Sequence, residues 1–353
     1  MPPMSETPVL PGRLGHLDVA RELRGYHTQP AQMRAAGPGK IGQLRLGFSL
    51  RNGRSILHDL YRVAPLLVQQ ALYWDEAMPE LPICSIISVG GGILQGDRYT
   101  IDITVQEGAC AQVNSQGYNR IHQMDANYAS QHQTIRLDAG AYLEYLPDFT
   151  IPYRDSRYIN HTDIIIDPSA TLLYGEMFMT GRKYHHASER FGFDTLSLLT
   201  IAQRPDGQRL FHDKILIEKS NELLDFAAVM RGYDAFASVM CLTPPDVAER
   251  IVARCEVQAG GGQAGGSQTG NLRTGNGQAG DGRAGSGQAG SGQAGGDRVR
   301  AWSGVSALPH EAGLILRAVG VESYDVRAEV RRFWQIVREE ARGRTLPDEF
   351  LWR

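Results

Sequence analysis

The stretch SVGGGILQGDRYTIDITV, residues 88–105, joins a glycine-rich turn to a β-like run. Its glycines permit a tight or left-handed turn that other residues would resist. After the turn, Tyr99–Val105 alternates apolar and polar residues, a pattern typical of a half-buried strand. The stretch therefore predicts a strand, a tight turn and a second strand.

The glycines of this turn do not fit the phosphate-binding motifs. In a dinucleotide-binding spacing that starts at Gly90, the third glycine would stand at Gln95, and the chain continues into a strand rather than a helix. In a P-loop spacing that starts at Gly91, a lysine must follow Gly96, but Asp97 stands there and would repel phosphate. A carboxylate at the base of such a turn accepts backbone N–H bonds or serves as an oxygen ligand for a metal.

Outward from this turn, β-like runs recur along most of the chain. They are punctuated by turns rich in Gly, Pro, Asp and Asn, and helical crossovers long enough for a parallel α/β sheet are missing. The sequence therefore predicts a mainly β fold of β-helix-like layered sheets. The other runs are Gln43–Leu50, Gln131–Leu137, Tyr142–Leu146, Thr162–Ile166, Thr171–Tyr174 and Leu210–Ile217.

Two helices are expected late in the chain. The first is Asn221–Val239, with Asn221 as N-cap. The second is Asp325–Arg342, with Asp325 as N-cap, an apolar face that includes Trp334, and Gly343 as its end. We expect both helices to pack on the β body.

Composition divides the chain into three parts. Residues 1–40 mix Pro, Gly, Gln and Arg without periodicity, which predicts a disordered lead-in. Residues 41–353 are expected to form a single domain. Within it, residues 258–297 consist largely of Gly, Gln, Ala and Ser, a composition that predicts a flexible insertion tolerated at the surface.

Bulk properties narrow the class of protein. A net charge of −3 gives no basic footprint for nucleic acid. No stretch approaches about 18 apolar residues, and the start lacks a signal-peptide pattern, so neither a membrane span nor secretion is expected. The four scattered cysteines suit a reducing compartment, where they would act as small buried hydrophobic residues. We expect a cytoplasmic protein.

Motifs for metal and covalent chemistry are sparse. The chain has neither CxxC nor HExxH, and the adjacent His185 and His186 would face opposite sides of a strand. His122, His132 and His212 lie near polar residues and are candidates for a transient site. Serine elbow-like triplets occur only inside the 258–297 tract, but the many carboxylates leave a β-helical carbohydrate hydrolase or lyase open.

Several motifs, in this order, resemble the urease accessory protein family UreD, also called UreH. SVGGGILQGD at 88–97 is similar to the family's glycine-rich GD element, and GAYLEYLPDFTIPY at 140–153 is similar to its GAxLEWLPDPTIPF segment. The segment Asn114–His122 departs from the family's Thr-Thr-Gln-rich pattern. Further matching elements are Gly108-Ala109, Gly181-Arg182, Glu189-Arg190-Phe191, Gly313–Arg317, Trp334, Arg338 and Leu351-Trp352.

This resemblance implies a non-enzymatic scaffold with β-helical sheets and two late helices. It would bind UreF and the GTPase UreG, dock on the structural subunits of apo-urease and help to deliver nickel. No cofactor would be tightly bound, and Ni²⁺ would pass in transit along an internal channel. Asp97 and Asp213 fall at positions that make them candidate channel carboxylates for nickel. A structural adaptor that handles no metal is a further alternative.

Overall fold

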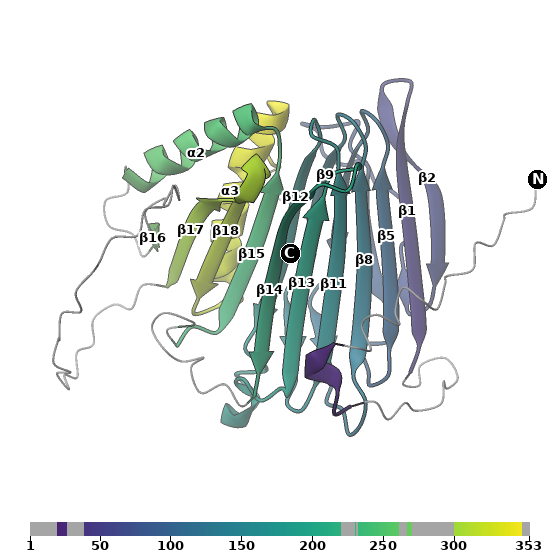
Figure 1. Cartoon of the computed structure of the whole chain (residues 1–353), viewed down its shortest axis with the longest axis vertical. Helices are drawn as coiled ribbons and strands as arrows, with labels where there is room; N and C mark the ends of the chain where they lie inside the picture. Colours follow the sequence, from purple (N-terminus) through teal and green to yellow (C-terminus); the bar gives the residue numbers. More distant parts are fainter. Residues whose placement is uncertain are drawn as a thin grey trace, which may run out of the picture.

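A computed structural model of the chain describes residues 20–26, 39–219, 230, 232–260, 267–269 and 300–347. Strands dominate this part of the chain, and two helices come late (Figure 1). The strands are β1 (Ile41–Arg51), β2 (Arg54–Val63), β3 (Leu66–Leu67), β4 (Ile83–Ser88), β5 (Arg98–Val105), β6 (Cys110–Ser115), β7 (Asn119–Ile121), β8 (Ala129–Leu137), β9 (Tyr142–Leu146), β10 (Thr150–Pro152), β11 (Arg157–Ile166), β12 (Thr171–Met179), β13 (Thr195–Gln203), β14 (Arg209–Glu218), β15 (Ala235–Leu242), β16 (Ser267–Thr269), β17 (Ala301–Ala307) and β18 (Gly313–Gly320). The α-helices are α2 (Pro245–Gly260) and α3 (Ser323–Arg342), and the 3₁₀ turns are η2 (Arg21–Leu23), η3 (Ala187–Glu189) and η5 (Pro309–Glu311).

The strands form two layered sheets. One is seven-stranded, in the order β14-β13-β11-β8-β5-β1-β2, and lies in front in Figure 1. The other is eleven-stranded, with the main order β16-β17-β18-β15-β12-β9-β6-β4-β3, while β10 and β7 pair beside this path. The prediction of a mainly β fold with layered sheets and two late helices is confirmed, and the narrower description as a β-helix stays a prediction.

Successive strands alternate between the two sheets. From β4 to β13 the chain crosses from one sheet to the other at nearly every turn, and neighbours such as β5, β8 and β11 pair in parallel. The tight turns at Gly108 and Gly140, each with positive φ, reverse the chain between a strand of one sheet and a strand of the other. Because these strands are in register, equivalent residues of successive strands stack on one face.

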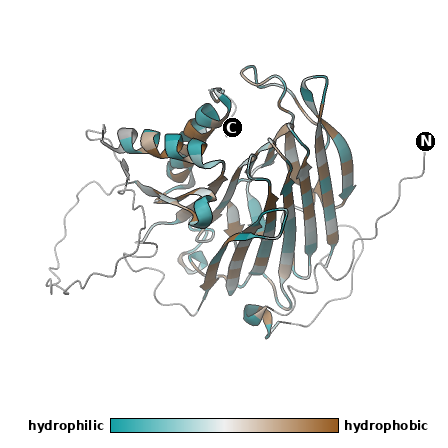
Figure 2. Cartoon of the chain, turned by 45° about the horizontal axis from the view of Figure 1, so that its top comes forward, coloured by the Kyte–Doolittle hydropathy of each residue, from teal (hydrophilic) through white to brown (hydrophobic). Residues whose placement is uncertain are grey.

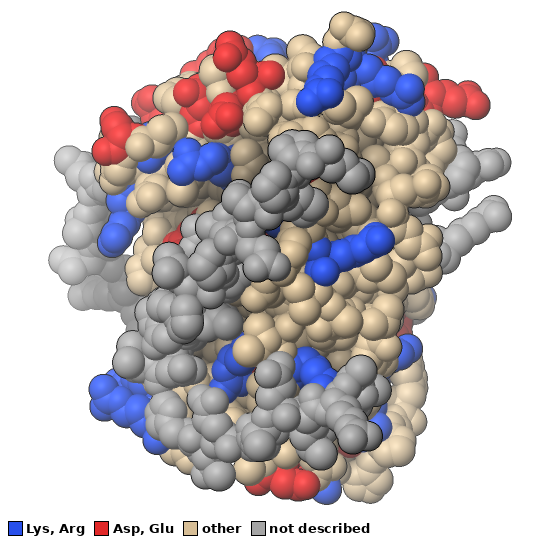
Figure 3. Space-filling view, turned by 90° about the vertical axis from the view of Figure 1, so that its right-hand side faces the viewer, with Lys and Arg blue, Asp and Glu red and all other residues tan. Residues whose placement is uncertain are grey.

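The main core lies between the sheets. Apolar side chains from alternate positions of both sheets fill it, among them Ile101, Ile135 and Leu172. The alternation is visible along the strands in Figure 2, where hydrophobic and hydrophilic residues succeed each other. A period of two residues directs one set of side chains inward and the other outward. On the side shown in Figure 3, described Lys and Arg residues stand in separate groups, with acidic and uncharged residues between them.

Helix α3 covers the outer face of the eleven-stranded sheet. Its buried residues Val330, Phe333 and Trp334 pack in a second core with β15 and β18. The predicted helix Asp325–Arg342 is therefore confirmed, ending at Gly343, whose φ is 64°. Its N-cap is Glu322 rather than Asp325, because the Asp325 carboxylate accepts a bond from the Glu322 N–H one turn earlier.

The other predicted helix, Asn221–Val239, is wrong at its end. Residues 221–229 lie outside the described part of the chain, but Ala235–Leu242 forms β15. Nearly all of β15 is buried because both of its faces are covered, so its sequence lacks the alternation of a half-exposed strand. The second late helix is instead α2, Pro245–Gly260, which begins with proline at a position where helices accept it.

Two segments predicted to lack structure are described in part. Within the predicted lead-in 1–40, residues 20–26 cross the outer face of the seven-stranded sheet, where Leu23 is buried against Tyr128 and Ile159 (Figure 1). Within the predicted insertion 258–297, residues 258–260 end α2 and residues 267–269 form β16. The rest of both segments, apart from residues 39 and 40, lies outside the described residues.

Candidate functional site

A cavity of about 250 Å³ opens between the two sheets. Its wall mixes apolar and polar side chains, and the glycine-rich turn and the segment 115–120 also line it. Polar residues that line it come from both sheets: Gln131, Gln133, Tyr145, Asn160, Tyr174 and Glu176. A cavity with such a lining can hold water or a small polar ligand.

Glu176, on β12, is one of two buried carboxyl groups among the described residues that line this cavity; the other, Asp148, is paired with Arg327. Asn160 Nδ2 donates to its Oε1 over 2.7 Å, and the Tyr174 hydroxyl donates to the same oxygen over 3.0 Å. Both partners are neutral. Burial raises the pKa of Glu176, the two hydrogen bonds oppose that rise, and the negative charge of Asp213 adds to it, so that the pKa is about 7. Glu176 therefore changes its protonation state near neutral pH.

A chain of neutral hydrogen bonds holds the cavity wall in place. The Tyr145 hydroxyl donates to Gln133 Oε1 over 2.6 Å, and Gln133 Nε2 donates to the Thr162 and Tyr174 hydroxyls over 3.0 and 3.1 Å. These residues belong to strands of both sheets, so the network joins the sheets across the core. Such a network fixes the orientation of Tyr174 and hence of Glu176.

The structure gives Asp97 a role in the glycine-rich turn. Its two carboxylate oxygens accept bonds from the backbone N–H groups of Lys40 and Leu94, over 2.8 and 2.9 Å, and from the Tyr99 hydroxyl over 2.8 Å. Asp97 is buried and stands behind Tyr99, which lines the cavity. Its function as a nickel ligand stays a prediction.

Asp213 lies on β14, at the edge of the seven-stranded sheet. Its Oδ1 accepts a bond of 2.6 Å from Arg317 Nη2 on β18, so the pair spans the two sheets at this edge. The Asp213 side chain is partly exposed, and its charge raises the pKa of Glu176. The structure thus brings Asp213 into the electrostatic range of the cavity, whereas Asp97 is held by hydrogen bonds within the glycine-rich turn.

The segment that departs from the family pattern forms the rim of the cavity. Gln116–Arg120 lines the opening next to Gly91 and Gly92. The φ of Gly92 is 141°, and a Cβ on this residue would approach the Arg120 carbonyl oxygen to 2.5 Å. The glycines of the turn therefore allow two backbone segments to meet at the rim.

Comparison with known proteins identifies the family. A family model described as UreD urease accessory protein matches residues 40–353. Urease accessory protein UreD 3 of Methylorubrum populi is 61% identical over 344 residues, which cover 98% of this chain and 99% of the relative. Urease accessory protein UreD of Yersinia pseudotuberculosis is 45% identical over 336 residues, which cover 95% of this chain and 93% of the relative. This chain belongs to the UreD family.

The UreD motif at 140–153 contributes to a buried ion pair as well as to the cavity, which Tyr145 lines. Glu144 points to the outer face of its sheet, where Arg338 of α3 donates to both of its oxygens, over 2.7 and 2.6 Å. Arg338 also donates to Asp75 over 2.5 Å, and all three side chains are essentially inaccessible. Two further motif residues of this UreD chain, Glu144 and Arg338, are thus paired with each other.

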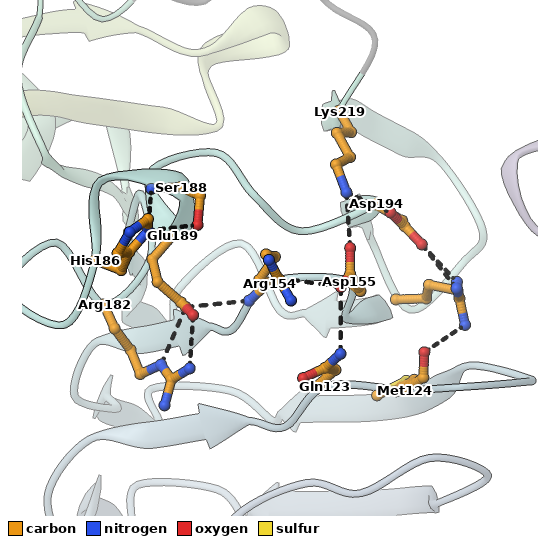
Figure 4. Close-up of polar contacts among 11 residues, drawn as sticks. Gln123, Met124, Arg154, Asp155, Arg182, His186, Ser188, Glu189, Asp194 and Lys219 are labelled. Atoms are coloured by element: carbon orange, nitrogen blue, oxygen red, sulfur yellow. Dashed lines mark hydrogen bonds and ion pairs between the residues drawn. The ribbon is translucent and has the colours of Figure 1, made fainter.

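The UreD motif residues Arg182 and Glu189 likewise have a structural role, in the loops at one end of the sheets (Figure 4). Arg182 Nη2 lies 2.6 Å from Glu189 Oε1, and Glu189 also accepts the backbone N–H of Arg154 over 3.2 Å. Beside this pair, Lys219 Nζ donates to Asp155 over 2.7 Å. These contacts tie the loop after β12 to the turn before β11.

Sequence reasoning missed Glu176, although a signal for it exists in this UreD chain. It is the carboxylate within Thr171–Met179, a strand whose every residue is buried. A charged residue in a run with no exposed position must find a partner or change its protonation state.

The cysteines are placed as the sequence predicts: Cys84, Cys110 and Cys241 are buried, and Cys255 is half-buried. Of the helices that the structure describes, none has the length and hydrophobicity of a membrane span.

Proposed function

We propose that this chain is a non-catalytic, cytoplasmic scaffold of urease maturation that binds UreF and the GTPase UreG, docks on apo-urease and passes Ni²⁺ through the cavity between its sheets. The family and the names of the relatives support a role beside urease. The observation that carries the nickel step is Glu176, a buried carboxyl group with neutral partners on a cavity wall. Nickel is cargo in this scheme.

The chemistry of the wall suits transit better than storage. Amide, hydroxyl and carboxyl oxygens are hard ligands that hold a borderline cation more loosely than thiolates do. Glu176 ionises near neutral pH, so it attracts an incoming dication and takes back a proton when the ion leaves. Asp213 supplies a second negative charge within electrostatic range, and Asp97 fixes the turn that forms the rim.

The test is urease activation in cells that express this chain together with the urease structural subunits, UreF and UreG. We expect Glu176→Gln to co-purify with UreF as the wild type does, but to give urease with less nickel and most of its activity lost. Glu218→Gln makes the same chemical change on an exposed side chain of β14 and serves as the control. Unchanged nickel content and activity of the Glu176→Gln complex would remove the proposed path. Failure of the wild-type chain to co-purify with UreF, UreG or urease would overturn the scaffold itself.

A further inference from the structure

The outer face of the seven-stranded sheet carries a cluster of three ligand-type side chains, His132, His161 and Asp163. Strands β8 and β11 are parallel neighbours, and their register places His132 directly beside His161. Asp163 follows His161 by two residues, so it points to the same face of β11. Residues 29 positions apart in the sequence thus converge because two strands pair in this one register.

The three side chains meet at their ligand atoms. His132 Nε2 lies 2.8 Å from Asp163 Oδ2, and His161 Nε2 lies 3.1 Å from Asp163 Oδ1. The two imidazole rings meet nearly edge to face, with centroids 5.3 Å apart. All three ligand atoms lie within 4.8 Å of one another. Two ligands of one ion, with bonds of about 2.1 Å, are separated by roughly 3 Å, which matches both histidine–aspartate distances.

This cluster is separate from the cavity. Gln131 and Gln133, the neighbours of His132, line the cavity on the inner face, so His132 projects from the opposite face of the same strand. Asn160, the neighbour of His161, likewise lines the cavity. The sheet therefore stands between the cluster and Glu176.

We propose that His132 Nε2, His161 Nε2 and the Asp163 carboxylate form a binding site for one divalent transition ion of borderline softness, such as Ni²⁺, Co²⁺ or Zn²⁺. Two imidazoles with one carboxylate are a ligand set that favours such ions over Mg²⁺ and Ca²⁺, which prefer oxygen ligands. Three protein ligands leave coordination positions for water. This site is additional to the nickel path proposed above and does not depend on it.

Accessibility and charge both favour entry of a cation past Asp163. The histidine rings are buried, whereas the Asp163 side chain is 36% exposed. The Asp163 carboxylate, which both histidines contact, is the acidic group at this opening. An ion can bind only where Nε2 of each ring is unprotonated, which puts the single ring proton of the neutral imidazole on Nδ1.

The competing explanation is a hydrogen-bonded cluster that stabilises the sheet without any ion. Histidine-to-glutamine variants distinguish the two explanations, because the glutamine amide N–H₂ reaches about as far as Nε2 and still donates to Asp163, but an amide nitrogen does not ligate a metal. The variants His132→Gln and His161→Gln therefore keep the hydrogen bonds and remove the ligands. His185→Gln is the matched control, since His185 is exposed and distant from the cluster in sequence.

The experiment titrates the full-length chain with Co²⁺ alone and follows its visible absorption. We expect one Co²⁺ per chain with a histidine-dependent band, displaced by Ni²⁺ or Zn²⁺ and unaffected by excess Mg²⁺. His132→Gln and His161→Gln should weaken binding at least about tenfold, and His185→Gln should bind as the wild type does. Bound ion should also raise the Tm of the wild type but not that of the two variants.

Two outcomes would overturn the site. One is a wild-type chain that gives no such band at one equivalent of Co²⁺, and the other is the same binding curve for the wild type and both glutamine variants. Glu176→Gln separates this site from the proposed nickel path: binding of Co²⁺ to the cluster should be unchanged in that variant. If Glu176→Gln instead removes the band, the ion binds in the cavity and the cluster proposal fails.

Discussion

Glu144 and Glu176 are both buried glutamates of the eleven-stranded sheet, yet they lie on opposite faces with opposite surroundings. Glu144 meets the guanidinium of Arg338, which α3 brings to the outer face. Glu176 faces the other sheet, and its hydrogen-bond partners Asn160 and Tyr174 are neutral. A buried carboxylate matched by a buried cation holds elements together, whereas one without such a cation is available to protons and cations that enter.

The largest effect on stability is expected when the Arg338 guanidinium is removed from its two carboxylate partners. Arg338→Met leaves Glu144 and Asp75 buried without their partner, so the free energy of unfolding should fall by about 3–5 kcal/mol. Urea denaturation of the purified chain measures it. Arg45→Met is the control, because Arg45 pairs with Asp59 at the surface. Its loss should lower the free energy of unfolding by no more than about 1 kcal/mol. Equal losses in both variants would contradict the structural reading of the Arg338 cluster.

The second test concerns the pH dependence of stability at Glu176. Its native pKa is about 7 against an ordinary 4.5, so between these values the native protein holds a proton that the unfolded chain has lost. The free energy of unfolding contributed by Glu176 therefore falls as the pH rises from about 4.5 to 7 and stays low above that range.

Glu176→Gln should abolish this contribution and make the chain more stable than the wild type above pH 7, by up to about 3 kcal/mol. Urea denaturation at pH 5 and pH 8 measures the difference between the two proteins. Glu218→Gln, on an exposed side chain, should leave the pH dependence of the wild type unchanged. The same slope in wild type and Glu176→Gln would mean that Glu176 is ionised throughout.

Asp97 provides a third kind of buried carboxylate, satisfied by backbone N–H groups and a tyrosine. Asp97→Ala leaves the N–H groups of Lys40 and Leu94 and the Tyr99 hydroxyl without this acceptor, so we expect a loss of about 2 kcal/mol. Thermal unfolding measures the loss, and urease activation per folded molecule tests the predicted nickel role separately. Reduced activation at equal folded protein would support the nickel role, and activation at the wild-type level would leave Asp97 with its structural role alone.

The smallest effect is expected at Asp213, where the ion pair with Arg317 is partly exposed. Asp213→Asn should change the free energy of unfolding by no more than about 1 kcal/mol. It also removes a charge that raises the pKa of Glu176, so the pH-dependent loss of stability should move to lower pH. An unshifted pH profile would show that Asp213 and Glu176 do not interact.

Most strands could be predicted because their patterns are local. Tyr142–Leu146 has the bounds expected from its sequence, and α3 follows its apolar periodicity to Gly343. Prediction failed at Ala235–Leu242, since a strand covered on both faces has no alternation and its apolar run resembles part of a helix. The cavity could not be predicted, because it depends on which faces of β8, β11 and β12 oppose one another.

The sequence by itself determined the family, the mainly β composition and the two-residue alternation that divides each strand between an inner and an outer face. Only the tertiary structure decided which charged groups meet. Arg338 is 194 residues from Glu144 and 263 from Asp75, and His132 is 31 residues from Asp163. The physical reason is that hydrophobic periodicity is a local property of the chain. Strand register and helix docking bring together side chains that are far apart in the sequence, and no local pattern indicates that they will be in contact.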